Sequence, residues 1–272
     1  MNAWPERLVL LGHPLGHSLS PLFQNAALRA ASIPLEYQLI DVPRSVLNET
    51  LAQLRRSRAA GNVTIPHKEA VRAVCDRVSS TAQAVGAINT FWTAVDGALV
   101  GDNTDVGGFD AAVRALIGAP REGETVALLG AGGAAAAVLH AMEGWPTARV
   151  RVYSRTRSRA EALVQRFKVP AEIMRSAESA VAEATLIVNA TPVGLRDDTV
   201  PVPLDSLAKN AAVLDLAYRI GETAFVRDAR ARGHVANDGM TMLVEQGALS
   251  FERWFGVAPD RAAMWDAIKS SR

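Results

Sequence analysis

The chain has 272 residues, a formal net charge of +1, 49% hydrophobic residues and 21% charged residues. This length accommodates two domains of roughly 100–200 residues each, and the composition is ordinary for a globular protein. The near-zero net charge predicts no nucleic-acid partner, no apolar run approaches the roughly 18 residues of a membrane span, and the single cysteine excludes an internal disulfide. Because the N-terminus runs directly into an apolar, strand-like segment without a signal peptide, we expect a cytoplasmic protein.

Strand and helix patterns alternate through the first hundred residues. The patterns predict strands at residues 8–11, 37–40 and 61–65 and helices at residues 21–31, 46–55 and 68–78. Ser20 is expected to cap the first helix, with Pro21 at its first position, and Cys75 to pack on the apolar face of the third. Asp96-Gly97 lies between apolar runs and predicts a hairpin. Since hairpin strands are antiparallel, this region is predicted to form a mixed sheet.

A glycine-rich turn marks a second region in the middle of the chain. The apolar run Val126–Leu129 leads into Gly130-Ala-Gly132-Gly133 and an alanine-rich helix, and a second strand is expected at 149–154. A strand, a glycine-rich turn and a helix in this order cradle a pyrophosphate, because the helix N-terminus offers unpaired amides. The sequence therefore predicts a dinucleotide site.

The end of the second strand indicates which dinucleotide is bound. An acid there would hold the ribose 2′-hydroxyl of NAD, whereas arginines accommodate the 2′-phosphate of NADP. This chain has Ser154, then Arg155, Arg157 and Arg159, and no acid before Glu161. NADP(H) is therefore the predicted cofactor, although arginines at a helix start can also be a solvated basic surface.

The remaining patterns complete an α/β architecture. They predict helices at residues 106–117 and 223–232, strands at 186–188 and 213–216, and an extended loop at 200–203. A short strand from Val235 and helices at 240–255 and 259–270 are predicted to follow. With no strand between them, the last two helices are expected to return to the first domain. We predict an N-terminal αβ substrate domain with a mixed sheet (1–104 and 239–272), a Rossmann-type NADP-binding domain (105–238), and a ligand site in the cleft between them.

Eight short motifs carry a resemblance to a known family. In order they are Gly12-His-Pro14 with His17-Ser18-Leu-Ser20-Pro21, Asn62-Val-Thr64-Ile-Pro66-His-Lys68, Gly86-Ala-Ile-Asn89-Thr90, Gly101-Asp-Asn103-Thr104-Asp105, Gly130-Ala-Gly132-Gly133-Ala, Asn189-Ala-Thr191-Pro-Val-Gly194, Asp215-Leu-Ala-Tyr218 and Gly239-Met-Thr-Met242-Leu-Val-Glu-Gln246. This ordered set, spanning nearly the whole chain, resembles the shikimate dehydrogenases. Those NADP-dependent enzymes reduce 3-dehydroshikimate to shikimate on the route to chorismate and the aromatic amino acids.

The resemblance implies a set of substrate-binding residues. By it, Ser18 and Ser20 hold the substrate carboxylate, which suits hydroxyls near a helix start. Thr64, Asn89 and Gln246 are implied to contact the carboxylate and the ring hydroxyls. Tyr218 is implied to line the cleft near the carboxylate and the cofactor.

The resemblance also implies a catalytic pair, Lys68 and Asp105, which would bind the substrate as well. Hydride transfer to a carbonyl leaves an alkoxide, which a lysine ammonium can protonate or stabilise while a carboxylate orients the lysine. Whether Lys68 is the proton donor or chiefly an electrostatic anchor stays open. Taken singly, Lys68 would be a solvated lysine and Asp105 the cap of the following helix.

The implied cofactor residues gather around the glycine-rich turn and the ends of the later strands. They are Gly130, Ala131, Gly132, Gly133, Ala134, Ala135, Ser154, Arg155, Thr156, Arg159, Thr191, Leu216, Gly239 and Met242. We expect no metal site, because the five histidines lack a ligand spacing. The chain departs from the family pattern at Gln24, where His is usual, at Ser154, where Asn is usual, and at Leu195, where Met is common. The change at Ser154 suggests weaker discrimination against NAD.

Other functions stay open beside this one. A quinate/shikimate dehydrogenase or a related paralogue would share the motifs with a different substrate or cofactor preference. A short-chain dehydrogenase is disfavoured, because no tyrosine is followed four residues later by lysine. A non-catalytic NADP-binding sensor would bind the cofactor without turnover. A small-molecule substrate is the only expected partner, and the sequence does not distinguish a monomer from a homodimer.

Overall fold

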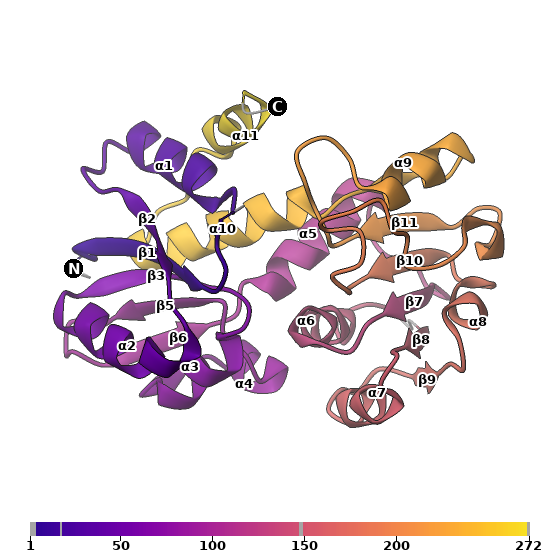
Figure 1. Cartoon of the computed structure of the whole chain (residues 1–272), viewed down its shortest axis with the longest axis horizontal. Coiled ribbons are helices and arrows are strands. Elements are labelled where there is room, and N and C mark those ends of the chain that lie inside the picture. Colours follow the sequence, from indigo (N-terminus) through magenta and orange to yellow (C-terminus); the bar gives the residue numbers. More distant parts are fainter. Residues whose placement is uncertain (1–3, 17, 147–148, 271–272) are drawn as a thin grey trace. The chain divides into compact units, whose positions relative to one another are not determined.

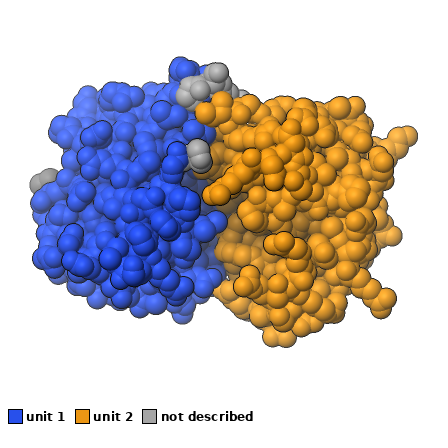
Figure 2. Space-filling view, viewed as in Figure 1, with its two compact units in different colours: residues 1–108, 243–272 blue, residues 109–242 orange. Residues whose placement is uncertain are grey.

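The computed structural model describes residues 4–16, 18–146 and 149–270, so His17 of the first motif lies outside the described residues. The chain divides into two compact units (Figure 2). Unit 1 comprises residues 1–108 and 243–272, and unit 2 comprises residues 109–242. Each unit contains one six-stranded sheet with helices packed against it (Figure 1). No helix among the described residues is long and apolar enough to cross a membrane.

Unit 1 is built on a mixed sheet, which confirms the predicted fold class. The strand order is β2-β1-β3-β5-β6-β4, with β1 (Arg7–Gly12), β2 (Tyr37–Asp41), β3 (Ala59–Val63), β4 (Arg77–Val78), β5 (Thr90–Thr93) and β6 (Leu99–Asp102). β1 pairs in parallel with β2 and β3, because helices connect these strands. β5 and β6 form the hairpin predicted around Asp96-Gly97, and β5 pairs antiparallel with β3.

Helices from both ends of the chain cover this sheet. They are α1 (Ser20–Ala30), α2 (Leu47–Arg56) after the short η1 (Arg44–Val46), α3 (Lys68–Val74), α4 (Ser80–Val85), α10 (Met240–Phe255) and α11 (Arg261–Lys269). Residues of α2, α3 and α4 share one buried cluster with β1, β3 and β5. α11 packs against α1, so the C-terminal helices do return to the first sheet (Figure 1). α5 (Asp105–Ile117) begins in unit 1 and ends in unit 2.

The helix predicted over 68–78 is too long. α3 ends at Val74, and Cys75 adopts an extended conformation with φ −70° and ψ 136°. Tertiary pairing overrides the helical spacing here, because Asp76 bonds Leu99 twice: its amide donates to the Leu99 carbonyl at 2.9 Å, and its carboxylate accepts from the Leu99 amide at 2.7 Å. Residues 77–78 then form β4 beside β6.

Unit 2 is a parallel sheet of the Rossmann type, as predicted. Its strand order is β12-β11-β10-β7-β8-β9, with β7 (Thr125–Leu129), β8 (Arg149–Tyr153), β9 (Ala171–Ile173), β10 (Leu186–Asn189), β11 (Ala212–Asp215) and β12 (Ala236–Asn237). All neighbouring pairs are parallel. From β7 the chain builds outward to β9, then returns to β10 and builds in the other direction. Between β7 and β10 the strand order therefore reverses, which is where such sheets bind ligands.

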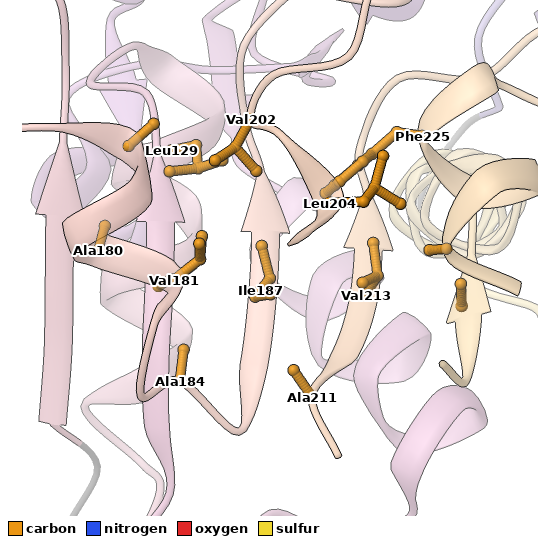
Figure 3. Packing of buried hydrophobic residues seen from close by; sticks show 14 of the residues in the cluster. Leu129, Ala180, Val181, Ala184, Ile187, Val202, Leu204, Ala211, Val213 and Phe225 are labelled. Carbon is orange, nitrogen blue, oxygen red and sulfur yellow. The ribbon is translucent and has the colours of Figure 1, made fainter. Parts of the chain in front are cut away.

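The helices of unit 2 bury both faces of this sheet. They are α6 (Gly133–Met142), α7 (Arg157–Val164), α8 (Ala177–Val181), η2 (Leu204–Ser206) and α9 (Ala224–Ala231). Figure 3 shows one face, where Leu129, Ile187 and Val213 of three adjacent strands meet Ala180 and Val181 of α8 and Phe225 of α9. Burial on both faces explains why these strands are continuous apolar runs. This packing fixes the carboxyl ends of β7, β10 and β11 relative to one another.

Candidate active site

Lys68 and Asp105 form the centre of the candidate site in unit 1. Lys68 is the first residue of α3 and Asp105 the first residue of α5. Lys68 Nζ donates to Asp105 Oδ2 at 2.6 Å, and the side chains are 23% and 8% exposed, respectively. The carboxylate is thus largely withdrawn from solvent while the ammonium is more accessible. Such a pair presents an oriented cation to a ligand.

Asn89 connects this pair to α10. Its side-chain oxygen accepts from the backbone amide and the hydroxyl of Thr104, at 2.7 and 3.1 Å. Its nitrogen lies 2.8 Å from Asp105 Oδ1 and 3.0 Å from Gln246 Oε1. Because an amide nitrogen carries two hydrogens, it can serve both acceptors at once. Lys68, Asp105, Asn89 and Gln246 are therefore joined by one continuous set of hydrogen bonds.

Ser250 extends this network and was not singled out from the sequence. It is fully buried, and its hydroxyl donates to the Gln246 carbonyl at 2.9 Å. The same oxygen lies 2.8 Å from Asn62 Nδ2 and 3.1 Å from Thr104 Oγ1. Its place one helical turn after Gln246, on the same face of α10, is the sequence signal that could have found it.

Ser18, Ser20 and Thr64 follow two neighbouring parallel strands. The segments after β1 and β3 are joined where the amide of His13 donates to the carbonyl of Ile65 at 3.1 Å. The expectation that Ser20 caps α1 is wrong, because Ser20 is already helical and makes no side-chain capping bond. Ser18 Oγ instead accepts from the Ser20 amide at 3.3 Å. Ser20 is 6% exposed, and its hydroxyl makes no hydrogen bond to another residue within the described ranges.

The glycine-rich turn lies at the switch point of the sheet in unit 2. Gly130 directly follows β7 with φ +121°, and a Cβ there would lie 2.8 Å from the Ala190 carbonyl oxygen, so the close approach of the residue after β10 requires glycine. Gly132 and Gly133 at the start of α6 face open space, since a Cβ on either would meet nothing within 4 Å. A helix N-terminus with unobstructed backbone fits the pyrophosphate of a dinucleotide. Ala131, Ala134 and Ala135 belong to this same turn and first helical turn.

The segment after β8 carries the basic residues. β8 pairs in parallel with β7, so Ser154, Arg155 and Thr156 lie at the same edge of the sheet as the glycine-rich turn. Ser154 Oγ accepts from the Thr156 amide at 3.3 Å. Arg157 is paired with Glu161, Nε to Oε1 at 2.9 Å, whereas Arg155 and Arg159 have no ion pair among the residues described.

The other cofactor candidates follow β10, β11 and β12. Thr191 follows β10, Leu216 follows β11, Gly239 follows β12, and Met242 is a buried residue in the first turn of α10. Tyr218 also belongs to unit 2, so it is not part of the hydrogen-bonded set around Lys68. Burial raises the pKa of its phenol, which is therefore neutral at physiological pH. In the part of the chain that the structure describes, no three His, Cys, Asp or Glu side chains are arranged to hold a metal ion.

Three family models cover most of the chain. The shikimate dehydrogenase substrate binding domain matches residues 10–91, shikimate / quinate 5-dehydrogenase matches 115–195, and the shikimate 5'-dehydrogenase C-terminal domain matches 239–269. A curated relative, the shikimate dehydrogenase (NADP(+)) of Symbiobacterium thermophilum, is 42% identical over 93% of this chain and 90% of its own.

The chain belongs to the shikimate dehydrogenase family.

Solved structures of shikimate dehydrogenases share its fold. The shikimate 5-dehydrogenase of Thermus thermophilus in complex with NADP(H) and shikimate is 40% identical, with a TM-score of 0.88 over 98% of this chain and 99% of that one. The quinate dehydrogenase of Corynebacterium glutamicum in complex with NAD is 30% identical, with a TM-score of 0.86 over 98% and 99%. The fold alone thus does not separate the substrate and cofactor preferences of these enzymes.

Proposed function

We propose that this chain is an NADP-dependent shikimate dehydrogenase, an oxidoreductase that interconverts 3-dehydroshikimate and shikimate in the biosynthesis of chorismate and the aromatic amino acids. The observation that carries the proposal is the Lys68–Asp105 pair at 2.6 Å within a chain of this family that also has a glycine-rich turn for a dinucleotide. The proposed substrate domain, residues 1–104 and 239–272, largely coincides with unit 1, and the proposed NADP-binding domain, residues 105–238, largely coincides with unit 2.

Shikimate is a small carboxylate with three hydroxyl groups, and unit 1 offers matching partners. Ser18 and Ser20 at the start of α1 suit the carboxylate, since the helix dipole favours an anion there. Thr64, Asn89 and Gln246 supply hydroxyl and amide groups for the carboxylate and the ring hydroxyls. Tyr218 is proposed as a further contact to the substrate. Asn89 would share its donors between the substrate and its present acceptors.

Unit 2 is proposed to hold NADP(H) along the carboxyl ends of its strands. The turn from Gly130 to Ala135 would receive the pyrophosphate, and Ser154, Arg155, Thr156 and Arg159 would surround the adenosine 2′-phosphate. Thr191, Leu216, Gly239 and Met242 would line the nicotinamide end. NADPH, when bound, supplies the hydride.

The chemistry of unit 1 is the handling of a proton. As the substrate carbonyl carbon is reduced, negative charge develops on its oxygen, and the Lys68 ammonium can stabilise that charge and donate a proton to the oxygen. Asp105 keeps the ammonium oriented through the 2.6 Å hydrogen bond and balances its charge. In the direction of oxidation, the same pair receives the hydroxyl proton.

The substrate and the cofactor are tested together in one experiment. Oxidation is followed at 340 nm, the absorbance of reduced nicotinamide, with shikimate or quinate crossed against NADP or NAD. We expect the highest kcat/KM with shikimate and NADP. A higher kcat/KM with quinate or NAD would instead identify the chain as a quinate/shikimate dehydrogenase or a related paralogue. Lack of turnover with every pair would refute the proposal.

A Lys68→Ala variant separates an enzyme from a cofactor-binding sensor. General acid catalysis contributes typically 10²–10⁴-fold, so kcat should fall by at least about 100-fold, whereas NADPH affinity should not change because Lys68 lies in unit 1. NADPH binding is measured by fluorescence titration of the same preparation. Wild-type protein that binds NADPH without turning over shikimate would favour the sensor.

A further inference from the structure

Asp215 is a buried carboxylate that the proposed chemistry does not use. It is the last residue of β11 and is fully buried. Its Oδ1 accepts from Asn189 Nδ2 at 2.8 Å and from the Ala217 amide at 3.1 Å, and its Oδ2 accepts from Thr223 Oγ1 at 2.7 Å. An ionised carboxylate only accepts hydrogen bonds. Two of the three partners, the Asn189 side-chain nitrogen and the Ala217 amide, can only donate, and the Thr223 hydroxyl can donate as well, so these surroundings fit the ionised form.

One of these donors controls the segment after β10. Only the amide nitrogen of Asn189 can face a carboxylate, so Asp215 fixes the orientation of that amide. With the amide so oriented, the Asn189 oxygen accepts from the Thr191 amide at 3.0 Å and from the Thr191 hydroxyl at 2.6 Å. The Asn189 nitrogen also donates to the carbonyl of Val193 at 3.2 Å. The position of Thr191, a proposed cofactor contact, thus depends on Asp215.

The other two donors control the segment after β11. The bond to the Ala217 amide holds the backbone beside Leu216 and Tyr218. The carbonyl of Ala217 in turn accepts from the amide of Gly239 at 3.0 Å. The Thr223 hydroxyl ties the far end of the segment, where it also caps α9. The Asp215 carboxylate therefore anchors both ends of the segment that contains Leu216 and Tyr218.

We propose that Asp215 is a positioning residue of the NADP(H) site, whose carboxylate holds the segments after β10 and β11 in the arrangement that receives the cofactor. This inference rests on the proposed function, because it is that proposal which assigns Thr191, Leu216 and Gly239 to the cofactor. Hydrogen bonds to an ionised acceptor are about twice as strong as neutral ones. A charge at this position therefore gives a more rigid anchor than an amide or a hydroxyl would.

The charge also makes the anchor dependent on pH. Burial raises the pKa of the Asp215 carboxyl to about 6, and nearby Asp238 adds to the rise, while the bonds from its three donors oppose it. On the segment after β11, Arg219 forms an ion pair with Asp198 and Glu222 forms one with Arg230. Protonation of Asp215 converts charge-assisted bonds into weaker neutral ones, so the two segments are expected to loosen as the pH falls below about 6.

Two substitutions test the anchor. Asp215→Ala leaves three buried donors unpaired and should raise the NADPH dissociation constant about tenfold or more. The KM for shikimate should rise as well, because the anchored segment also carries Tyr218, a proposed substrate contact. Asp215→Asn keeps an oxygen for Asn189 and Ala217 and can donate to Thr223, so it should recover most of the affinity. Asp205→Asn makes the same chemical change at a 92% exposed aspartate of unit 2 and serves as the matched control.

A pH series on the folded Asn variant keeps the test independent of whether Asp215→Ala folds. The NADP 2′-phosphate also titrates near pH 6, so only the ratio of dissociation constants, variant over wild type, reports Asp215. That ratio should be largest above about pH 7 and approach one near pH 5. A pH-independent ratio, or an Asp215→Ala protein that binds NADPH as tightly as wild type, overturns the inference and leaves the proposed function standing. Wild-type protein that does not bind NADPH overturns the proposed function itself.

Discussion

The three arginines at the start of α7 are not equivalent. Arg157 Nε lies 2.9 Å from Glu161 Oε1, one helical turn away, so its charge is partly neutralised within the helix. Arg155 and Arg159 are exposed and, within the described ranges, have no acidic partner. A 2′-phosphate on the adenosine ribose would meet these two side chains without displacing an existing ion pair.

Arg159→Gln should therefore raise the KM for NADP about tenfold or more, because a hydrogen bond to a charged group contributes roughly 1.5–3 kcal/mol. The KM for NAD should not change, since NAD has no 2′-phosphate. Arg155→Gln should act in the same direction, and Arg157→Gln is the matched control with an effect below about twofold. The measurement is the KM for each nucleotide at saturating shikimate. Equal losses for both nucleotides would contradict the assignment.

At the level of single residues, the sequence was a better guide to which side chains lie together than to the hydrogen bonds that they form. The motifs implied that Lys68 and Asp105 act as a pair, and the structure places them in contact. Their catalytic role stays a prediction. The capping of α1 by Ser20 was wrong by one position, which is the usual uncertainty of a helix start. Ser250 was missed although it lies one helical turn after Gln246, because its other partners, Asn62 and Thr104, are distant in sequence.

Two helices that carry proposed substrate residues, α1 and α10, approach closely at Gly247. A Cβ at Gly247 would lie 2.4 Å from Phe23 Cε2 and 3.1 Å from Gln24 Nε2, and Phe23 is fully buried. Gln24 Nε2 also donates to the Gly247 carbonyl at 3.0 Å. Gln24 lies one turn after Ser20, and Gly247 directly follows Gln246. The spacing of the two helices therefore sets the positions of Ser20 and Gln246 relative to each other.

Gly247→Ala should lower the free energy of unfolding by about 1–3 kcal/mol, the usual cost of inserting a methyl group into a packed core. The KM for shikimate should rise. The affinity for NADPH should stay unchanged, because the proposed NADPH site belongs to unit 2. Gly107→Ala is the control, since its Cβ would meet only the end of the partly exposed Leu249 side chain, at 2.6 Å. Because Gly107 lies in α5, its replacement by alanine should leave the free energy of unfolding unchanged or raise it by up to about 1 kcal/mol through the higher helix propensity of alanine. Urea denaturation of both variants gives the comparison, and equal stabilities would refute the packing argument.

Among the helices and strands, the strength of the local signal decided what the sequence could predict. The hairpin around Asp96-Gly97 and the helix at 240–255 were predicted correctly, because turn chemistry and long periodicity are strong local signals. α4, β9 and α8 were not predicted, and these elements have only six, three and five residues. β4 was predicted as helix, because its strand character comes entirely from pairing with β6.

Over the whole molecule, the order of strong elements sufficed to predict two α/β units with the glycine-rich turn in the second. An apolar run followed by glycine and an alanine-rich helix is local information, so the Rossmann type could be predicted from it. The polar network around Asp215 could not, because it joins the ends of β10, β11 and α9 only after the sheet has formed. Burial of the ionised Asp215 carboxylate within this network nevertheless has a cost in folding free energy, which follows from its raised pKa.

That cost predicts how the stability of the molecule depends on pH. The Asp215 carboxyl has an ordinary pKa of 3.8 and a folded-state pKa of about 6. Between these values the folded state binds more protons than the unfolded state, so the free energy of unfolding falls as the pH rises. Above about pH 6 the full difference amounts to about 3 kcal/mol. Asp215→Asn removes this loss and should be more stable than wild type at pH 7.5, with an advantage that shrinks towards pH 4.

Hydrogen exchange of the β10 and β11 amides, with wild type and variant compared at each pH, measures that advantage within unit 2. An Asn variant less stable than wild type at pH 7.5 would show that the three hydrogen bonds outweigh the burial of the charge. An Asn variant that is more stable than wild type but binds NADPH more weakly would show that the burial of the charge outweighs the three hydrogen bonds. In that case the chain retains an ionised Asp215 at the expense of stability because the cofactor site requires it, as functional sites commonly do.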